Sequence, residues 1–102
     1  MPIEHEPFYS LLGIAMRAGV LTFGQDAVLK AISSGTAGFV LLDSGASDNT
    51  KKKISDSCRY YGVDLFETAQ DRLGYAVGKP GRMSVAVAKG TLGDRLYELA
   101  KK

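Results

Sequence analysis

The apolar positions of this chain follow two spacings, one typical of helices and one typical of buried strands. In the first segment the apolar side chains recur every three or four residues, at Phe8, Leu11, Leu12, Ala15 and Met16. This spacing places them on one face of a helix. The same criterion predicts helices at about residues 7–18, 25–34, 48–61, 71–77 and 93–101, with Ser47 or Asp48 capping the third.

Short apolar runs lie between these helices and predict strands at residues 20–23, 39–42, 63–66 and 83–88. The run at residues 39–42 has no polar position, which indicates a strand covered on both faces. Because helices and strands alternate with short turns, we expect an α/β fold: a three-layer sandwich with helices on both faces of the sheet. We expect residues 1–102 to form a single domain.

Composition narrows the class of protein. The chain has 102 residues, 45% of them hydrophobic, so one domain can bury a core without disulfides. The single cysteine, Cys58, cannot form an internal disulfide, and no apolar run of signal-peptide length opens the chain. Charged residues interrupt every long apolar segment, so no membrane-spanning helix is predicted. We therefore expect a soluble, cytoplasmic protein.

The net charge of +2 is unevenly distributed along the chain. Residues 1–50 carry two basic and five acidic side chains, a net charge of −3. Residues 51–102 carry 11 basic and six acidic side chains, a net charge of +5. Such asymmetry is typical of a protein with an anionic partner, although helices also carry lysines for solubility alone.

The sequence offers little catalytic or metal-binding chemistry. The single histidine, His5, lies in the terminal segment and Cys58 on an apolar helical face, so neither a metal site nor a Cys–His nucleophile is predicted. Four aspartates are interpreted as separate turn and capping residues, Asp43, Asp48, Asp64 and Asp71. Residues 78–81 lack the spacing of a phosphate loop. We therefore expect no enzyme activity and no cofactor.

Two segments carry candidate ligand-binding residues. Gly24 lies where a strand meets a helix, and Gln25, Asp26 and, one turn later, Lys30 follow it. Free backbone N–H groups at such a helix start favour an anion or a polar base edge. The second segment is the basic linker at residues 78–82, whose glycines and proline predict an irregular path beside Gly24.

Six segments match one known family in order and spacing. They are Leu-Leu-Gly-Ile-Ala at 11–15, Gly-Gln-Asp-Ala-Val-Leu-Lys at 24–30, Phe-Val-Leu-Leu at 39–42, Asn-Thr-Lys-Lys-Lys at 49–53, Tyr-Tyr at 60–61 and Leu-Gly-Tyr-Ala-Val-Gly-Lys at 73–79. Together they resemble the kink-turn-binding ribosomal protein superfamily of the L-seven-Ae and L-thirty-e type, and most closely its bacterial YlxQ-like branch. The resemblance covers about residues 8–100.

The resemblance implies both a fold and a partner. The fold is an α/β/α sandwich around a small mixed sheet, here of four strands. The partner is structured RNA of kink-turn or related type, such as ribosomal RNA, bound without catalysis by a ribosome-associated protein. We expect the free protein to be a monomer.

In this superfamily, a polar pair after the glycine at the start of the second helix reads sheared G·A base pairs, and a lysine further along contacts RNA. Gly24 and Lys30 match this pattern, but Asp26 and Ala27 stand where kink-turn readers typically carry asparagine and glutamate. An ionised aspartate only accepts hydrogen bonds, and alanine offers neither donor nor acceptor. Gln25 is therefore a candidate for the missing donor, and Asp26 either accepts from a guanine or caps its own helix.

The superfamily's second RNA contact is the loop after the Leu-Gly-x-Ala helix, which presents apolar atoms to an extruded base. Here that loop is Gly78 to Met83, and it adds two cations, Lys79 and Arg82. The resemblance thus implies a more electrostatic grip on phosphate, with stacking by the Arg82 guanidinium; the alternative is a solvated turn. The candidate RNA-binding residues are Gly24, Gln25, Asp26, Lys30, Gly78, Lys79, Arg82 and Met83.

A second hypothesis keeps the scaffold but changes the function. Because the Asp26–Ala27 pair removes hydrogen-bonding groups that kink-turn readers use, the domain would be a protein-interaction module with weak or lost RNA binding. The lysines at 51–53 are compatible with either function: they contact an anionic partner such as RNA, or they only make their helix more soluble.

Overall fold

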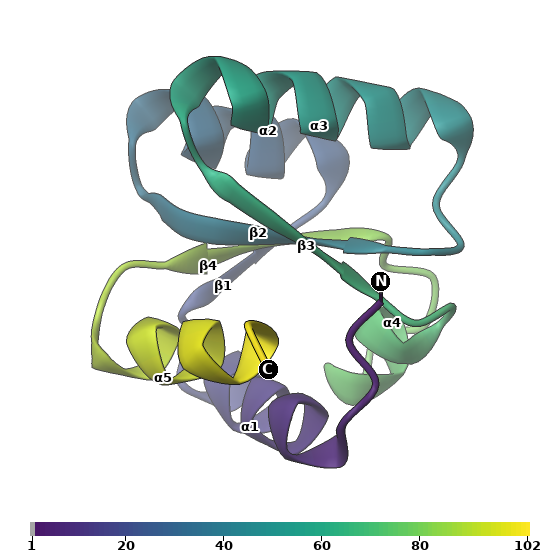
Figure 1. Cartoon of the computed structure of the whole chain (residues 1–102), viewed down its shortest axis with the longest axis vertical. Helices are drawn as coiled ribbons and strands as arrows, with labels where there is room; N and C mark the ends of the chain where they lie inside the picture. Colours follow the sequence, from purple (N-terminus) through teal and green to yellow (C-terminus); the bar gives the residue numbers. More distant parts are fainter. Residues whose placement is uncertain (1) are drawn as a thin grey trace.

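The computed structural model describes residues 2–102 and shows a four-stranded sheet between two layers of helices (Figure 1). The helices are α1 (Glu6–Arg17), α2 (Gln25–Ser34), α3 (Asp48–Tyr61), α4 (Arg72–Ala76) and α5 (Thr91–Ala100). The strands are β1 (Leu21–Phe23), β2 (Ala37–Asp43), β3 (Asp64–Thr68) and β4 (Ser84–Ala88). The predicted α/β/α sandwich is confirmed.

The sheet is mixed, with strand order β1-β4-β2-β3. β2 and β3 are parallel, whereas β4 runs antiparallel to both of its neighbours, β1 and β2. β1, β2 and β3 therefore point in the same direction. Their carboxyl ends and the start of β4 lie at one end of the sheet, so the loops that follow the three strands and the loop that precedes β4 gather there.

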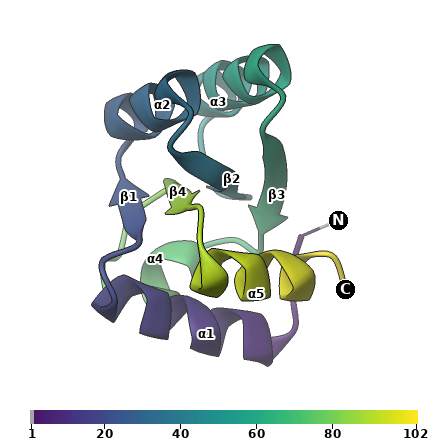
Figure 2. The ribbon, with the colours of Figure 1, turned by 90° about the vertical axis from the view of Figure 1, so that its left-hand side faces the viewer.

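The two faces of the sheet are covered by different helices. α2 and α3 lie on one face, and α1, α4 and α5 lie on the other (Figures 1 and 2). Alternate residues of β2 belong to the two cores: Phe39 and Leu41 lie in the same hydrophobic cluster as Leu12, whereas Val40 lies in the cluster of Ile54. This double burial explains why the strand has no polar position in its centre.

Cys58 lies in the core beneath α3 and is only 3% exposed, as its place on the apolar stripe predicted. Burial raises the pKa of its thiol to about 11, so the thiol stays protonated at neutral pH. Within residues 2–102, no three histidine, cysteine, aspartate or glutamate side chains lie close enough together to hold a metal ion. None of the helices in this range is long and apolar enough to cross a membrane.

Several element boundaries differ from the prediction. β2 begins at Ala37 rather than Phe39, because its pairing with β4 continues past a register shift to Ala88. α5 begins at Thr91, so Gly93 lies inside the helix instead of starting it. A Cβ at Gly93 would lie 2.4 Å from the Ala88 carbonyl oxygen, so this glycine serves close packing. Ser47 is the cap of α3, and its Oγ accepts a hydrogen bond from the Thr50 amide.

Asp43 differs most from its predicted role as a turn residue, because it ends β2 with a fully buried side chain. Its Oδ1 accepts hydrogen bonds from Thr68 Oγ1 at 3.1 Å and Leu73 N at 3.2 Å. Its Oδ2 accepts from Gly45 N and Asp71 N, both at 2.9 Å. One carboxylate thus joins β2, β3 and the start of α4.

Replacing Asp43 should destabilise the whole domain. Asp43→Ala removes the acceptor for four donors at a buried site, and we expect the free energy of unfolding to fall by about 3 kcal/mol. Urea unfolding followed by circular dichroism measures this change. Asp94→Ala, at an exposed position of α5, is the matched control and should lower stability by less than about 1 kcal/mol. Equal effects of the two substitutions would contradict the role of Asp43.

Candidate nucleic-acid interface

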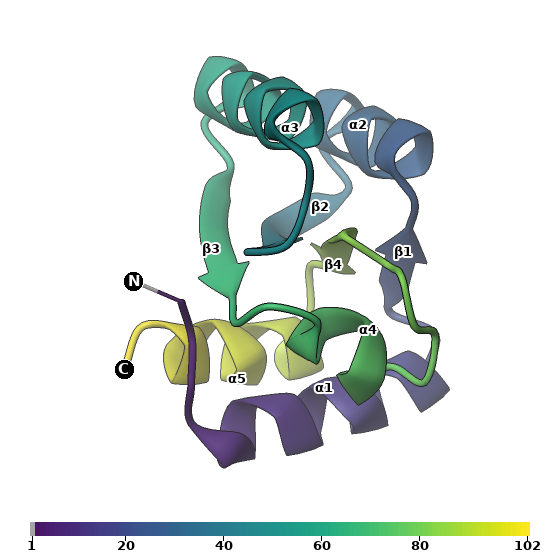
Figure 3. The same ribbon diagram turned by 90° about the vertical axis from the view of Figure 1, so that its right-hand side faces the viewer.

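The predicted ligand-binding segments meet at the end of the sheet where β4 begins. After α4, the chain runs past β1 before it enters β4 (Figure 3). This loop, residues 78–83, therefore lies next to the junction between β1 and α2. The sequence predicted this proximity, and the common direction of the first three strands produces it.

The ring of Phe23, the last residue of β1, lies close to both cations of the loop, Lys79 and Arg82. Lys79 Nζ lies 5.7 Å from the centroid of the Phe23 ring, and Arg82 Cζ lies 5.8 Å from it. Both separations fall within the range of cation–π attraction. Because Phe23 directly precedes Gly24, the two positive charges stand beside the first turn of α2.

Gly24 is the N-cap of α2 and has a φ of 93°, a conformation that disfavours residues with a Cβ. Gly24 provides no side-chain cap, and Asp26 is the acidic residue of the first turn of α2. Asp26 is exposed on the second residue of the helix. The positive end of the helix dipole and its first N–H groups face the sheet end that holds the loop, which favours a polar or anionic ligand.

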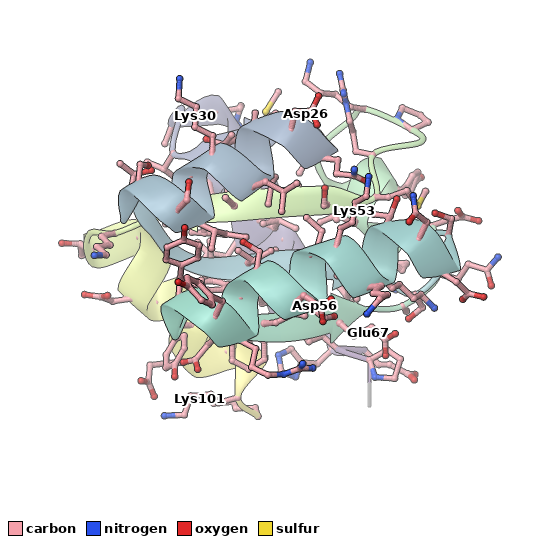
Figure 4. The ribbon with its side chains drawn as sticks, turned by 90° about the horizontal axis from the view of Figure 1, so that it is seen from above. Asp26, Lys30, Lys53, Asp56, Glu67 and Lys101 are labelled. Carbon is pink, nitrogen blue, oxygen red and sulfur yellow. The ribbon has the colours of Figure 1, made fainter. Side chains whose placement is uncertain are left out.

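The polar residues at the start of α2 point in different directions. Gln25 is half-buried and faces α3, where its Oε1 accepts a hydrogen bond from Thr50 Oγ1 at 2.9 Å. Figure 4 looks onto α2 and α3 and shows Asp26 and Lys30 on the outer side of α2. Lys30 is exposed and contributes to a separate shallow hollow that also includes Thr22 and Thr36. Of the predicted residues, Lys30 thus lies farthest along the helix from the loop.

The lysines that begin α3 are not equivalent. Lys52 Nζ forms an ion pair with Asp56 Oδ2 at 3.1 Å, and both side chains are exposed. Such a surface pair contributes little to stability. Lys53 is exposed on α3 (Figure 4), whereas Lys51 is half-buried. Of these three lysines, Lys53 is therefore the one that is exposed and does not take part in the ion pair with Asp56.

A pocket of about 330 Å³ opens between α4 and the loop. Its wall includes Pro80, Gly81 and Met83 from the loop and Tyr75 from α4. Met83 lies just before β4 rather than inside it, and its carbonyl oxygen accepts a hydrogen bond from Asp43 N at 2.9 Å. Polar residues such as Gln70 and Asp71 also line the pocket, so its wall is both apolar and polar.

Sequence reasoning did not select Tyr75 as a site residue, because its pattern could not distinguish a packed ring from an exposed one. The Tyr75 side chain is 78% exposed and lines the pocket, so it is available for stacking. Tyr60 is also exposed, at 81%, and contacts Tyr61 edge to face at the carboxyl end of α3. Of Tyr60 and Tyr75, it is Tyr75 that lines the pocket beside the loop.

The path of the loop depends on Gly74, which is buried in α4. A Cβ at this position would lie 2.8 Å from the Lys79 carbonyl oxygen and 3.2 Å from Arg82 N. The absence of a side chain therefore allows the loop to turn back over α4. Gly78, with a φ of 71°, begins that turn in the left-handed conformation.

The layer order and this composite surface define a small α/β/α domain with a polar, partly basic surface at one end of a mixed sheet. Residues 6–95 match the family described as Ribosomal protein L7Ae/L30e/S12e/Gadd45. The chain belongs to this family, as the sequence motifs predicted.

Sequence relatives place the chain in the YlxQ-like branch of this family. RNA-binding protein YlxQ of Bacillus subtilis (strain 168) is 39% identical over 94 residues, which cover 90% of this chain and 93% of the relative. RNA-binding protein YlxQ of Enterococcus faecium is 37% identical over 82 residues, which cover 79% and 80%.

Solved structures agree with the fold. A protein of unknown function from Bacillus halodurans C superposes with a TM-score of 0.88 at 33% identity, covering 96% of this chain and 100% of the other. The Giardia lamblia 15.5kD RNA binding protein superposes with a TM-score of 0.79 at 20% identity, covering 99% and 91%. The second likeness is one of fold alone.

Gly74→Ala should displace the loop. The new methyl group would overlap the backbone of residues 79–82, and we expect a loss of about 1–3 kcal/mol in unfolding free energy. The amide NMR resonances of Lys79 and Arg82 should shift as well. Gly93→Ala is the control, since its Cβ would overlap Ala88 at the opposite end of the sheet. It should destabilise the domain without moving those resonances, and a shift of equal size in both variants would contradict the loop's dependence on Gly74.

Proposed function

We propose that this protein binds structured RNA of kink-turn or related type, such as ribosomal RNA, through the sheet end that holds α2 and the loop of residues 78–83. It acts without catalysis, as a cytoplasmic, ribosome-associated monomer. The observation that carries the proposal is the approach of Lys79 and Arg82 to Phe23, beside Gly24, because it joins two separate segments into one surface. The names of the two YlxQ relatives, which describe RNA-binding proteins, support the same conclusion.

The surface offers three kinds of RNA contact. The first-turn N–H groups of α2, with the Gln25 amide, are donors for the acceptor atoms of base edges. Lys30, Lys79 and Arg82 supply positive charge for phosphates. The pocket beside Met83, with the exposed ring of Tyr75, has the apolar and aromatic character suited to an unpaired base.

The Asp26–Ala27 pair sets how this surface reads RNA. Both residues are exposed; an aspartate carboxylate only accepts hydrogen bonds, and alanine offers neither donor nor acceptor. Base reading at α2 must then rely on backbone N–H groups and on Gln25, while phosphate contacts provide most of the affinity. Binding should therefore depend strongly on salt concentration.

RNA shape provides the decisive comparison. We expect the purified protein to bind a kink-turn RNA about tenfold or more tightly than a matched duplex without the kink, at near-physiological salt with excess competitor. Fluorescence anisotropy of labelled RNA measures both affinities. Equal or absent binding would contradict kink-turn recognition and favour the protein-interaction module that the Asp26–Ala27 pair permits.

The basic residues should contribute without supporting the fold. Arg82→Ala and Lys30→Ala should each weaken kink-turn binding by about threefold to tenfold and lower the salt dependence by about one phosphate contact. Arg95→Ala, at an exposed position of α5, is the matched control and should bind like the parent protein. All variants should unfold like the parent protein. Unchanged affinity in Arg82→Ala and Lys30→Ala would remove these residues from the interface.

A further inference from the structure

A chain of hydroxyl groups connects the cap of α3 to the first residue of α2. Ser47 Oγ donates to Thr50 Oγ1 at 3.1 Å, and the Thr50 amide donates back to Ser47 Oγ at 3.2 Å. Thr50 Oγ1 then donates to Gln25 Oε1 at 2.9 Å. Residues 25 and 50 come from different helices, so only the tertiary structure brings them together.

The contact with Thr50 defines the orientation of the Gln25 amide. Thr50 Oγ1 lies 2.9 Å from Gln25 Oε1, and a hydroxyl group at this distance from an amide oxygen donates to it. Because the Thr50 proton is used on Gln25, Thr50 Oγ1 is the acceptor in its 3.1 Å contact with Ser47 Oγ. The amide oxygen therefore faces α3, and the NH2 group is turned away from the hydroxyl and left to donate to a ligand.

We propose that Thr50 is a positioning residue for Gln25, which it holds as a hydrogen-bond donor at the RNA-binding edge of α2. This inference rests on the proposed function. In this arrangement the Gln25 NH2 group donates to an acceptor atom of a base, such as guanine O6 or a purine N7. The neighbouring Asp26 carboxylate cannot make this contact, because it has no proton to donate.

The physical gain is preorganisation. A free glutamine side chain loses conformational entropy when it binds, and its amide presents oxygen or nitrogen with similar ease. The hydrogen bond from Thr50, itself supported by the cap of α3, removes most of that freedom before RNA arrives. Half-burial of both Gln25 and Thr50 protects the bond from competing water.

Thr50→Val keeps the size of the side chain but removes its hydroxyl. The backbone N–H of residue 50 can still donate its hydrogen bond to Ser47 Oγ, so the cap of α3 is retained. We expect Thr50→Val to weaken kink-turn binding by about threefold to tenfold, and Thr50→Ser, which keeps the hydroxyl, to restore it. In a Gln25→Ala background, Thr50→Val should change the affinity no further. Thr91→Val, at the opposite end of the sheet, is the matched control and should bind like the parent.

NMR of the free full-length protein tests the orientation without RNA. The sequence contains two glutamines, so the side-chain NH2 signals of Gln25 can be followed with Gln70 as an internal reference. Thr50→Val should shift the Gln25 signals and leave those of Gln70 in place. Unshifted Gln25 signals would overturn the inference.

The two proposals fail in different ways. Suppose that the parent protein prefers kinked RNA. If Thr50→Val binds this RNA as tightly as the parent does, or if the substitution weakens binding by the same factor in the parent and in the Gln25→Ala background, the role of Thr50 is overturned. The proposed function then stands. If the parent shows no preference for kinked RNA, the proposed function fails together with the reading role of Gln25. The NMR shift then decides whether Thr50 orients the amide.

Discussion

The hydrogen-bonded, buried carboxylate of Asp43 is the interaction on which the arrangement of the sheet end with the candidate interface depends. It accepts hydrogen bonds from the turn after β2, from Thr68 in β3 and from two backbone groups at the start of α4. A buried carboxylate requires such complete pairing, because an unpaired charge in the core is strongly unfavourable. Since α4 leads directly into the loop of residues 78–83, this pairing also sets where the loop begins.

Strand direction then assembles the interface from parts that are distant in the sequence. Three strands end, and the fourth begins, at the same side of the sheet. This common end brings together the start of α2, the start of α3 and the loop after α4 (Figure 3). Ring contacts and close packing complete the assembly: Phe23 faces both loop cations, and Gly74 gives the loop space to fold over α4.

The proposed interface combines positive charges on a loop with hydrogen-bond donors on a helix. Lys79 and Arg82 extend from a loop and suit contacts with phosphate, which carry affinity but little sequence information. The N–H groups of α2 and the amide of Gln25 are held by secondary structure and by Thr50, so they suit base edges at defined positions. The resemblance implies asparagine at the position of Asp26 in kink-turn readers, so the proposed function assigns the donor role to the neighbouring Gln25.

The sequence by itself determined the layers and the family, and it singled out the two segments of the candidate interface, because apolar periodicity and the Gly24 and Gly78 motifs are local features. It placed β2 and α5 within about two residues, since propensity does not define where pairing stops. It could not predict that Asp43 is buried or that Tyr75 is exposed, because each outcome depends on neighbours from other elements. The tertiary structure alone decided that Thr50 meets Gln25, since a hydrogen bond across 25 residues follows from helix packing and not from local sequence.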